Sequence, residues 1–177
     1  EVIDAGRGYG RACLAAARLA ADDDILVFMD GDGADDAAAI AALIAPIEAG
    51  RYDFVIGSRA RGRREPGSIA WHQLAAGYIA GLGMRMLYGV RYTDMCAFRA
   101  VRRKTLLQLD MREMTYGWNI EMQMRAARAG LRVLELPVDY RRRRGGSSKV
   151  AGSLSGTLRA GTRIIATFAR VARSGRR

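Results

Sequence analysis

Two aspartates separated by one residue follow an apolar run near the start of the chain. The segment 27–33 reads Val-Phe-Met-Asp-Gly-Asp-Gly, so a predicted strand delivers the carboxylates of Asp30 and Asp32 into a turn. Hard carboxylate oxygens placed in this way suit Mg²⁺ or Mn²⁺. Such an ion neutralises the charge that grows on a departing diphosphate. An acidic surface turn that ends a strand would show the same short pattern.

The same two aspartates fit a second chemistry, the transfer of a phosphoryl group to a carboxylate. The motif resembles that of haloacid-dehalogenase-like phosphatases, in which the first Asp attacks phosphorus and the second serves as acid and base. Those enzymes usually continue with Thr and an apolar residue, whereas Ala34 and Asp35 stand here, and their later Lys and paired-acid motifs have no convincing counterpart. A phosphohydrolase is therefore the second interpretation of Asp30 and Asp32.

A run of four arginines lies in the second half of the chain. Arg141 to Arg144 are followed by Gly-Gly-Ser-Ser-Lys, which ends at Lys149. Arginine forks, serine hydroxyls and backbone N–H groups beside glycines bind phosphate well. The alternatives are a solvated basic loop and a nucleic-acid patch. Beyond Tyr140, no stacking aromatic interleaves with the arginines, so we expect no nucleic-acid partner.

Two further carboxylates stand in unusual contexts. Asp94 follows a helix of small residues and precedes Cys-Ala-Phe-Arg at 96–99, which makes it a candidate for a base or for a group that orients an acceptor. A loop Asp without such a role fits there as well. Glu121 lies in an otherwise apolar helix, where a carboxylate has to be paired or functional. A salt bridge to a nearby Arg is the simpler interpretation of Glu121.

The sequence offers few residues from which other types of catalytic site could be formed. His72 is the only histidine, so Ser-His or Cys-His triads and multi-histidine metal sites are not expected. Cys13 and Cys96 are far apart and in no C-x-x-C spacing, so the sequence suggests neither a disulfide framework nor a zinc site. Two such cysteines favour a reducing, cytoplasmic setting.

The composition sets the outer limits of the interpretation. The 177 residues are half hydrophobic, which is enough for one sizeable core. Lys and Arg number 29 against 18 Asp and Glu, and the net charge of +11 favours anionic partners without choosing among them. The chain opens on Glu-Val-Ile, which reads as a strand, so we expect an amino-terminally truncated domain. The longest apolar run, 74–84, is too short to span a bilayer.

The elements that must position these residues alternate along the chain. Strand-like runs lie at 25–29, 54–56, 96–101 and 131–140, and helical segments lie at about 10–21, 37–49, 68–88 and 117–129. This alternation predicts an α/β fold with an open mixed sheet and helices on both faces. Ligands bind such sheets beyond the carboxyl ends of the strands, where the acidic loop lies.

The carboxy-terminal segment predicts a basic amphipathic helix. Over 154–172, apolar and basic side chains separate onto opposite faces, with Leu154, Leu158, Ile165 and Phe168 on one and Arg159, Arg163, Arg170 and Arg173 on the other. Such a helix fits a protein that lies on a membrane, with its arginines at anionic headgroups. The alternative is an ordinary core-packing helix. We divide the chain into a catalytic domain, 1–152, and this helix, 153–177.

Taken together, the motifs resemble glycosyltransferase family 2, and within it the branch of dolichyl-phosphate mannosyltransferase-like and polyprenyl-phosphate glycosyltransferases. The resemblance covers nearly the whole chain. It rests on Asp30-Gly-Asp32, Ile56-Gly-Ser-Arg59, Thr93-Asp-Met-Cys-Ala-Phe-Arg99, Tyr116-Gly-Trp-Asn-Ile-Glu-Met122, Glu135-Leu-Pro-Val138 and Gly146-Ser-Ser-Lys149. Two features depart from the family: Ala34 stands where relatives often have a metal-contacting Gln, and the strand that contacts the nucleoside base is absent.

This resemblance implies the nucleotide-diphospho-sugar transferase fold, of the GT-A type. It also implies an inverting enzyme that moves a sugar from a nucleoside-diphosphate sugar to a polyprenyl phosphate, such as a dolichyl or undecaprenyl phosphate. Asp30 and Asp32 would then bind Mg²⁺ or Mn²⁺ and the donor diphosphate, with Arg59 also on the donor side.

On the acceptor side, the resemblance implies that Arg143, Ser148 and Lys149 grip the acceptor phosphate. A phosphate acceptor is already anionic and needs no strong base. A hydroxyl acceptor would require a carboxylate base, for which Asp94 is preferred to Glu121. Asp94 and Asp32 are therefore the expected catalytic residues.

The resemblance and the basic helix together lead us to expect a peripheral protein at the cytoplasmic face of the membrane. The alternative functions that stay open are the phosphohydrolase and a non-catalytic basic module that binds acidic lipid or nucleic acid.

Overall fold

A four-stranded mixed sheet forms the centre of the protein. The structure is a computed structural model that describes residue 6, residues 8–145 and residues 154–174. The strands are ordered β1-β3-β2-β4. β1 (Ile25–Phe28), β2 (Phe54–Ser58) and β4 (Val133–Pro137) share one direction, and β3 (Arg99–Arg102) runs the opposite way. The predicted open mixed sheet is confirmed, while the strand expected at residues 1–3 lies outside the described residues.

The position of β3 decides which loops meet. β3 lies between β1 and β2, although it follows both of them in the sequence. Arg99, its first residue, is in register with Phe28 on one side and with Ile56 on the other. Because β3 is antiparallel to both neighbours, it begins where they end. The loop that carries Asp94 therefore reaches the same edge of the sheet as the loops that follow β1 and β2.

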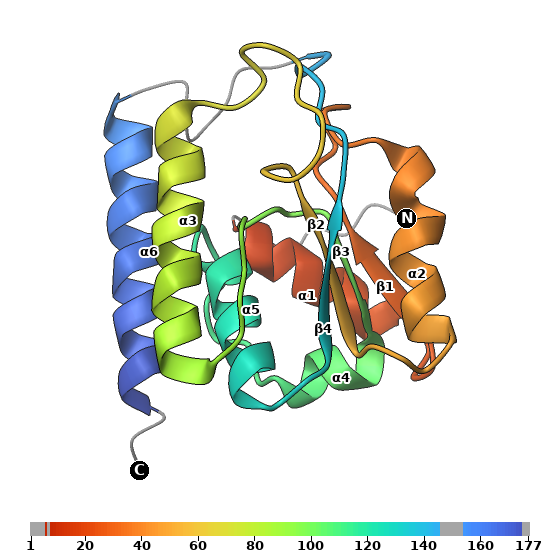
Figure 1. The fold of residues 1–177 in the computed structure, drawn as a ribbon. Helices are drawn as coiled ribbons and strands as arrows, with labels where there is room; N and C mark the ends of the chain where they lie inside the picture. The colour runs from red at the N-terminus through yellow and green to blue at the C-terminus, as the bar shows by residue number, and fades with distance from the viewer. Residues whose placement is uncertain (1–5, 7, 146–153, 175–177) are drawn as a thin grey trace.

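Helices cover both faces of this sheet (Figure 1). The helices are α1 (Tyr9–Leu19), the 3₁₀ turn η1 (Ala37–Ala39), α2 (Ile40–Glu48), α3 (Trp71–Tyr88), α4 (Arg103–Gln108), α5 (Trp118–Arg128) and α6 (Leu154–Ser174). Asp36 caps the turn η1, since its carboxylate accepts a hydrogen bond from the Ala38 N–H. The short helix α4 was not predicted, because its Arg-Lys-Thr start lacks an apolar period.

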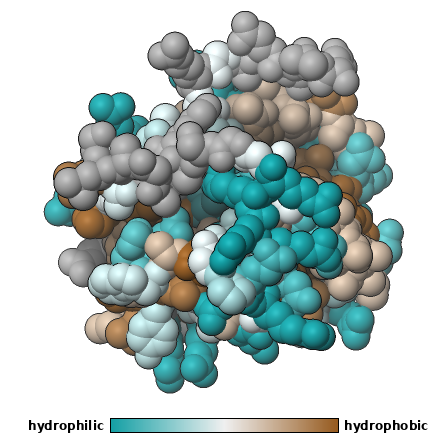
Figure 2. All heavy atoms as spheres, turned by 90° about the horizontal axis from the view of Figure 1, so that it is seen from above, coloured by the Kyte–Doolittle hydropathy of each residue, from teal (hydrophilic) through white to brown (hydrophobic). Residues whose placement is uncertain are grey.

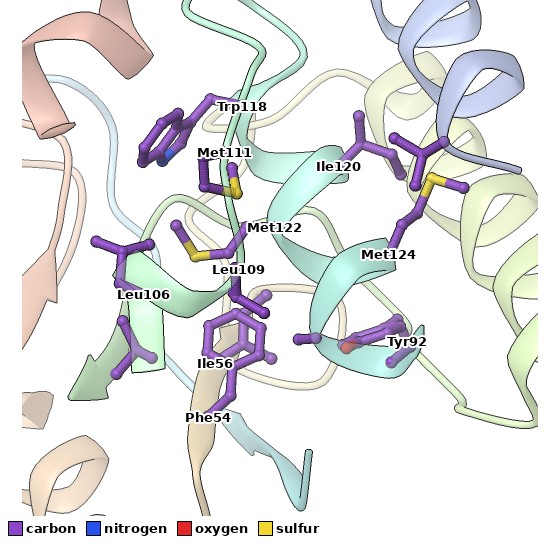
Figure 3. Close-up of a cluster of buried hydrophobic side chains, with 14 of the residues drawn as sticks. Phe54, Ile56, Tyr92, Leu106, Leu109, Met111, Trp118, Ile120, Met122 and Met124 are labelled. Atoms are coloured by element: carbon purple, nitrogen blue, oxygen red, sulfur yellow. The ribbon is translucent and has the colours of Figure 1, made fainter. Parts of the chain in front are cut away.

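The two faces of the sheet bury two separate apolar clusters. Phe54 and Ile56 of β2 point into the larger cluster, which includes the buried apolar residues of α5 and is drawn in Figure 3. Val55, between them, points to the other face and packs with Leu43 and Ile47 of α2. This alternation follows from the two-residue period of a strand. Because β2 is covered on both faces, all five of its residues are buried.

The helix α6 packs against α5 and adds Val171 to the larger cluster. Its buried residues Ala160, Thr167 and Val171 recur with the period of a helix face. The core-packing interpretation therefore accounts for the face of α6 that carries Ala160, Thr167 and Val171. The division of the chain at residue 152 stays a prediction. In the described part of the chain, no helix has the length and apolar character needed to cross a bilayer.

Candidate active site

The loop after β1 is held in shape by its own carboxylates. The Ala34 N–H donates to Asp32 Oδ1 over 3.0 Å, and the Asp30 N–H donates to Asp35 Oδ2 over 3.0 Å. Gly33 has a φ of +75°, a conformation that glycine adopts without strain. This turn brings three carboxylates into one small region at the carboxyl end of β1.

Crowding and burial make this region unfavourable for negative charge. Burial raises the pKa of Asp30, and repulsion by Asp32 raises it further. Burial likewise raises the pKa of Asp35 to about 6. Asp35 Oδ1 is buried and accepts no hydrogen bond. The loop is therefore an electrostatic environment in which a cation is stabilised.

An arginine and an aspartate pair next to this loop. Arg59, at the end of β2, donates from Nε and Nη2 to the two oxygens of Asp94 over 2.8 Å each, and its backbone N–H donates to Asp94 Oδ2 over 2.9 Å. Asp94 is only 3% exposed. Burial disfavours the charge of Arg59, but the bonds to Asp94 outweigh this effect and raise the pKa of Arg59. The pair is a fixed, bidentate ion pair.

Both carboxylate oxygens of the predicted site residue Asp94 therefore accept hydrogen bonds from Arg59. Its Oδ1 also accepts a hydrogen bond from the Met95 N–H over 2.7 Å. On its other side, the Arg59 guanidinium lies 5.0 Å from the centre of the Tyr140 ring. The structure therefore brings Asp94 and Arg59 to the predicted edge, and it orients Arg59 from two sides.

Glu135 of β4 supports this pair, a role that the sequence interpretation missed. Its Oε1 accepts from the Thr93 N–H and its Oε2 from the Thr93 hydroxyl, both over 2.8 Å. Thr93 Oγ1 also lies 2.7 Å from Ser58 Oγ. Glu135 therefore fixes the loop that carries Asp94. The available signal was a carboxylate placed inside an otherwise apolar strand.

The arginine-rich segment lies directly beside the aspartate loop. The Arg141 N–H donates to the Ala34 carbonyl and the Arg144 N–H to the Asp32 carbonyl, each over 2.9 Å. Arg143 Nε lies 3.1 Å from Asp32 Oδ2. Figure 2 looks onto this end of the molecule and shows hydrophilic residues across much of its centre. The two strongest motifs in the sequence therefore form one site, although Ser148 and Lys149 lie outside the described residues.

Other candidates lie away from the site. Glu121 is buried and pairs with Arg125 over 3.0 Å, and one of its oxygens also accepts from the Arg112 N–H. The salt-bridge interpretation of Glu121 is confirmed. His72 is exposed at the start of α3. The Glu121 partners Arg112 and Arg125 lie in α5 or before it and not in the aspartate loop.

The carboxylates of the loop suit a divalent ion that is shared with a diphosphate. In the part of the chain that the structure describes, no three His, Cys, Asp or Glu side chains are arranged to hold a metal ion. Mg²⁺ commonly takes one or two carboxylates and completes its coordination with substrate phosphates and water. Asp30 and Asp32 fit this donor set, because a cation offsets both the burial and the repulsion by Asp32 that raise the pKa of Asp30.

Comparison with known proteins decides the class of this site. Residues 2–109 match the sequence profile of the family described as "Glycosyl transferase family 2". The chain belongs to glycosyl transferase family 2. Membership makes the chain a glycosyltransferase of this family. It favours a glycosyltransferase over the phosphohydrolase and over the non-catalytic module.

The relatives of this family 2 glycosyltransferase include proteins with named activities. The chain is 33% identical over 159 residues to an undecaprenyl-phosphate mannosyltransferase of Micrococcus luteus, and the match covers 84% of this chain and 63% of that protein. It is 32% identical over 154 residues to a polyprenol monophosphomannose synthase of Mycolicibacterium smegmatis, covering 81% of this chain and 58% of the relative. An uncharacterized glycosyltransferase of Mycobacterium tuberculosis is 35% identical, with 89% and 70% coverage.

Solved structures confirm the fold. The glucosyl-3-phosphoglycerate synthase of Mycobacterium tuberculosis, crystallised with Mn²⁺, uridine-diphosphate-glucose and glycerol 3-phosphate, matches 96% of this chain and 57% of its own with a TM-score of 0.68. The sequence identity is 18%, so the likeness concerns the fold alone. The predicted GT-A type fold of this family 2 glycosyltransferase is confirmed.

Proposed function

We propose that this glycosyltransferase moves a sugar from a nucleoside-diphosphate sugar to a polyprenyl phosphate, with inversion at the anomeric carbon. The observation that carries the proposal is the contact between the arginine-rich segment and the aspartate loop. Two backbone hydrogen bonds, Arg141 to Ala34 and Arg144 to Asp32, hold the segments together. A phosphate held by the arginines would therefore lie beside a diphosphate at the aspartates. Two relatives are named for acceptors of this kind.

On the donor side, Asp30 and Asp32 would hold Mg²⁺ or Mn²⁺ together with the diphosphate. When bound, the ion supplies positive charge to the leaving group as the glycosidic bond breaks. Arg59 adds a second, permanent positive charge near Asp30, which partly offsets the burial and the Asp32 repulsion that raise the pKa of Asp30. The residues of this loop therefore bind the donor and stabilise the departing nucleoside diphosphate.

On the acceptor side, Arg143, Ser148 and Lys149 would hold the acceptor phosphate. One phosphate oxygen attacks the anomeric carbon while the bond between that carbon and the diphosphate oxygen breaks, and the nucleoside diphosphate leaves with the electron pair. No proton has to be removed from an ionised phosphate. Asp94 then contributes by holding Arg59, and it would serve as a base only with a hydroxyl acceptor.

We place the reaction at the cytoplasmic face of a membrane, where a polyprenyl phosphate presents its head group. The +11 net charge favours an anionic surface. Cys13 and Cys96 are both free, which fits a reducing compartment.

The test uses the complete gene product with isolated membranes, Mg²⁺ or Mn²⁺ and a panel of labelled sugar nucleotides. We expect label in the lipid phase, and a fall on the order of 10²-fold for Asp32→Asn. Asp23→Asn is the matched control, because this exposed aspartate precedes β1 and so lies at the opposite end of that strand from Asp32. Label that is independent of metal and of Asp32, or no label with any donor, would contradict the proposal.

A further inference from the structure

The outward face of α3 is apolar along its whole length. Five large apolar side chains of this helix are exposed at positions that share one face, namely Trp71, Tyr78, Ile79, Leu82 and Met86. Trp71 is 79% exposed and Met86 is 80% exposed. The opposite face, with Gly77, Gly81 and Met84, is buried against the protein. The exposed stripe is therefore additional to the face that folding needs.

The helix α6 widens this stripe. A Cβ added at Gly83 of α3 would lie 2.7 Å from the Phe168 ring, so the two helices touch there, and they run side by side (Figure 1). Leu158 and Ile165, seven residues apart on α6, are 61% and 70% exposed. Phe168, which the sequence placed on the membrane face, packs inward against α3 instead. We call the exposed apolar residues of the two helices the α3–α6 face.

Charge on the two helices is of one sign. Arg85 of α3 and Arg159 and Arg173 of α6 are exposed, and neither helix contains an Asp or a Glu. Exposed apolar patches mark contact surfaces. Apolar side chains combined with arginines and aromatic residues, and without carboxylates, are typical of helices that lie in the interface of an anionic bilayer.

We propose that the α3–α6 face docks on an anionic phospholipid bilayer, with α3 as the main contact. The inference rests on the proposed function and deepens it, because the polyprenyl acceptor resides in a membrane. Both helices begin at the end of the molecule that carries the site loops (Figure 1). The loop before Trp71 is joined to the arginine-rich segment, since the Arg142 N–H donates to Glu65 Oε2 over 2.8 Å and Arg142 Nε donates to the Pro66 carbonyl over 2.7 Å. Docking therefore places the acceptor-binding segment next to the lipid surface.

A second copy of the chain is a poorer occupant of this face. In a symmetric dimer, the same patch contacts itself. The arginines of α3 and α6 would then face one another with no carboxylate on either helix to pair with them. Like charges across an interface oppose association, whereas anionic headgroups compensate the same arginines.

The first experiment uses the fluorescence of Trp71 in the full chain. Trp71 is exposed and Trp118 is 0% exposed, so only the former can change its environment on docking. We expect vesicles of brominated phosphatidylglycerol to quench the emission of the wild type, and Trp71→Phe to abolish this quenching. Unquenched emission at vesicle concentrations that sediment the protein overturns the proposal.

The second experiment compares two double variants in sedimentation with phosphatidylglycerol vesicles. Ile79→Gln with Met86→Gln removes apolar surface from the α3–α6 face, and Leu19→Gln with Leu107→Gln removes exposed apolar surface elsewhere. We expect roughly tenfold weaker binding for the first variant and none of this loss for the control. Equal binding of the two variants overturns the proposal. The proposal is also overturned if light scattering shows that the wild type is a dimer, whereas the Ile79→Gln and Met86→Gln variant is a monomer that binds vesicles as well as the wild type.

A soluble acceptor allows membrane docking and catalysis to be tested separately. With a short, water-soluble prenyl phosphate, the Ile79→Gln and Met86→Gln variant should transfer sugar at the wild-type rate, since these residues lie outside the active site. Vesicle binding through Trp71 without sugar transfer to any prenyl phosphate supports docking and rejects the proposed function. Transfer by a wild type that binds no vesicles rejects docking and leaves the function intact.

Discussion

The ion pairs of this protein differ in burial, and therefore in how much each contributes to stability. The pair between Arg59 and Asp94 is largely buried, at 17% and 3% side-chain exposure, and joins the end of β2 to the loop before β3. The pair between Arg63 and Asp139 is exposed and 4.0 Å long. Removing one partner of a buried pair leaves an uncompensated charge, whereas exposed pairs contribute little.

Asp94→Asn is therefore expected to lower the free energy of unfolding by about 3 kcal/mol, because Arg59 stays buried without a counterion. The exposed control Asp139→Asn should stay within about 0.5 kcal/mol of the wild type. Urea denaturation followed by circular dichroism measures both values. Equal free energies of unfolding for the Asp94→Asn and Asp139→Asn proteins would show that water already compensates the charge of Arg59.

At the scale of elements, Glu113 fastens α6 to the rest of the fold. Its carboxylate is buried and accepts from Arg163 over 2.9 Å and from the Thr167 hydroxyl over 3.2 Å. Thr115 donates to the same side chain from the preceding loop of α5. Burial alone would raise the pKa of Glu113, but the bonds from Thr115 and Arg163 outweigh it and lower this pKa below its ordinary value.

A lowered pKa gives this contact a definite dependence on pH. Glu113 binds its proton less readily in the folded than in the unfolded chain, so its contribution to stability is complete above the unfolded pKa of about 4.3 and is lost as pH falls through the folded pKa. Glu113→Gln should be less stable than the wild type at neutral pH, and this difference should shrink in acid. Urea titrations from about pH 7 to about pH 3 measure it, with exposed Glu48→Gln as control.

At the scale of the whole molecule, the site joins distant parts of the chain. Its groups come from the loops after β1 and β2, from the loop before β3 and from the segment after β4. A ligand that bridges these segments binds the folded chain and not the unfolded one. Such a ligand therefore stabilises the entire fold through linkage.

We expect Mn²⁺ together with the matching nucleoside diphosphate to raise the free energy of unfolding by about 2.7 kcal/mol at a hundredfold excess over the dissociation constant. Mn²⁺ alone should have a smaller effect, because Asp30 and Asp32 offer few ligands and Arg143 already neutralises Asp32. Thermal unfolding with a panel of nucleoside diphosphates measures the shift, and Asp32→Asn should abolish it. A shift that survives this substitution would place the ion elsewhere.

The sequence by itself determined the chemistry and the elements. The Asp30 and Asp32 motif, the arginine run and the alternation of apolar periods are local signals, because each depends on residues within one strand, turn or helix. They predicted the mixed α/β sheet and most of its elements within a few residues. A local signal also suggested the salt bridge of Glu121 to a nearby Arg.

Only the tertiary structure decided which of these elements meet. Arg59 and Asp94 are 35 residues apart, and Thr93 and Glu135 are 42 apart. Nothing local records such partners, because they depend on the insertion of β3 between β1 and β2. The exposed face was decided in the same way. Hydrophobic periodicity shows which side of a helix is apolar but not which neighbour covers it, so α6 packs inward through Phe168 while α3 keeps Trp71 and Met86 in contact with solvent.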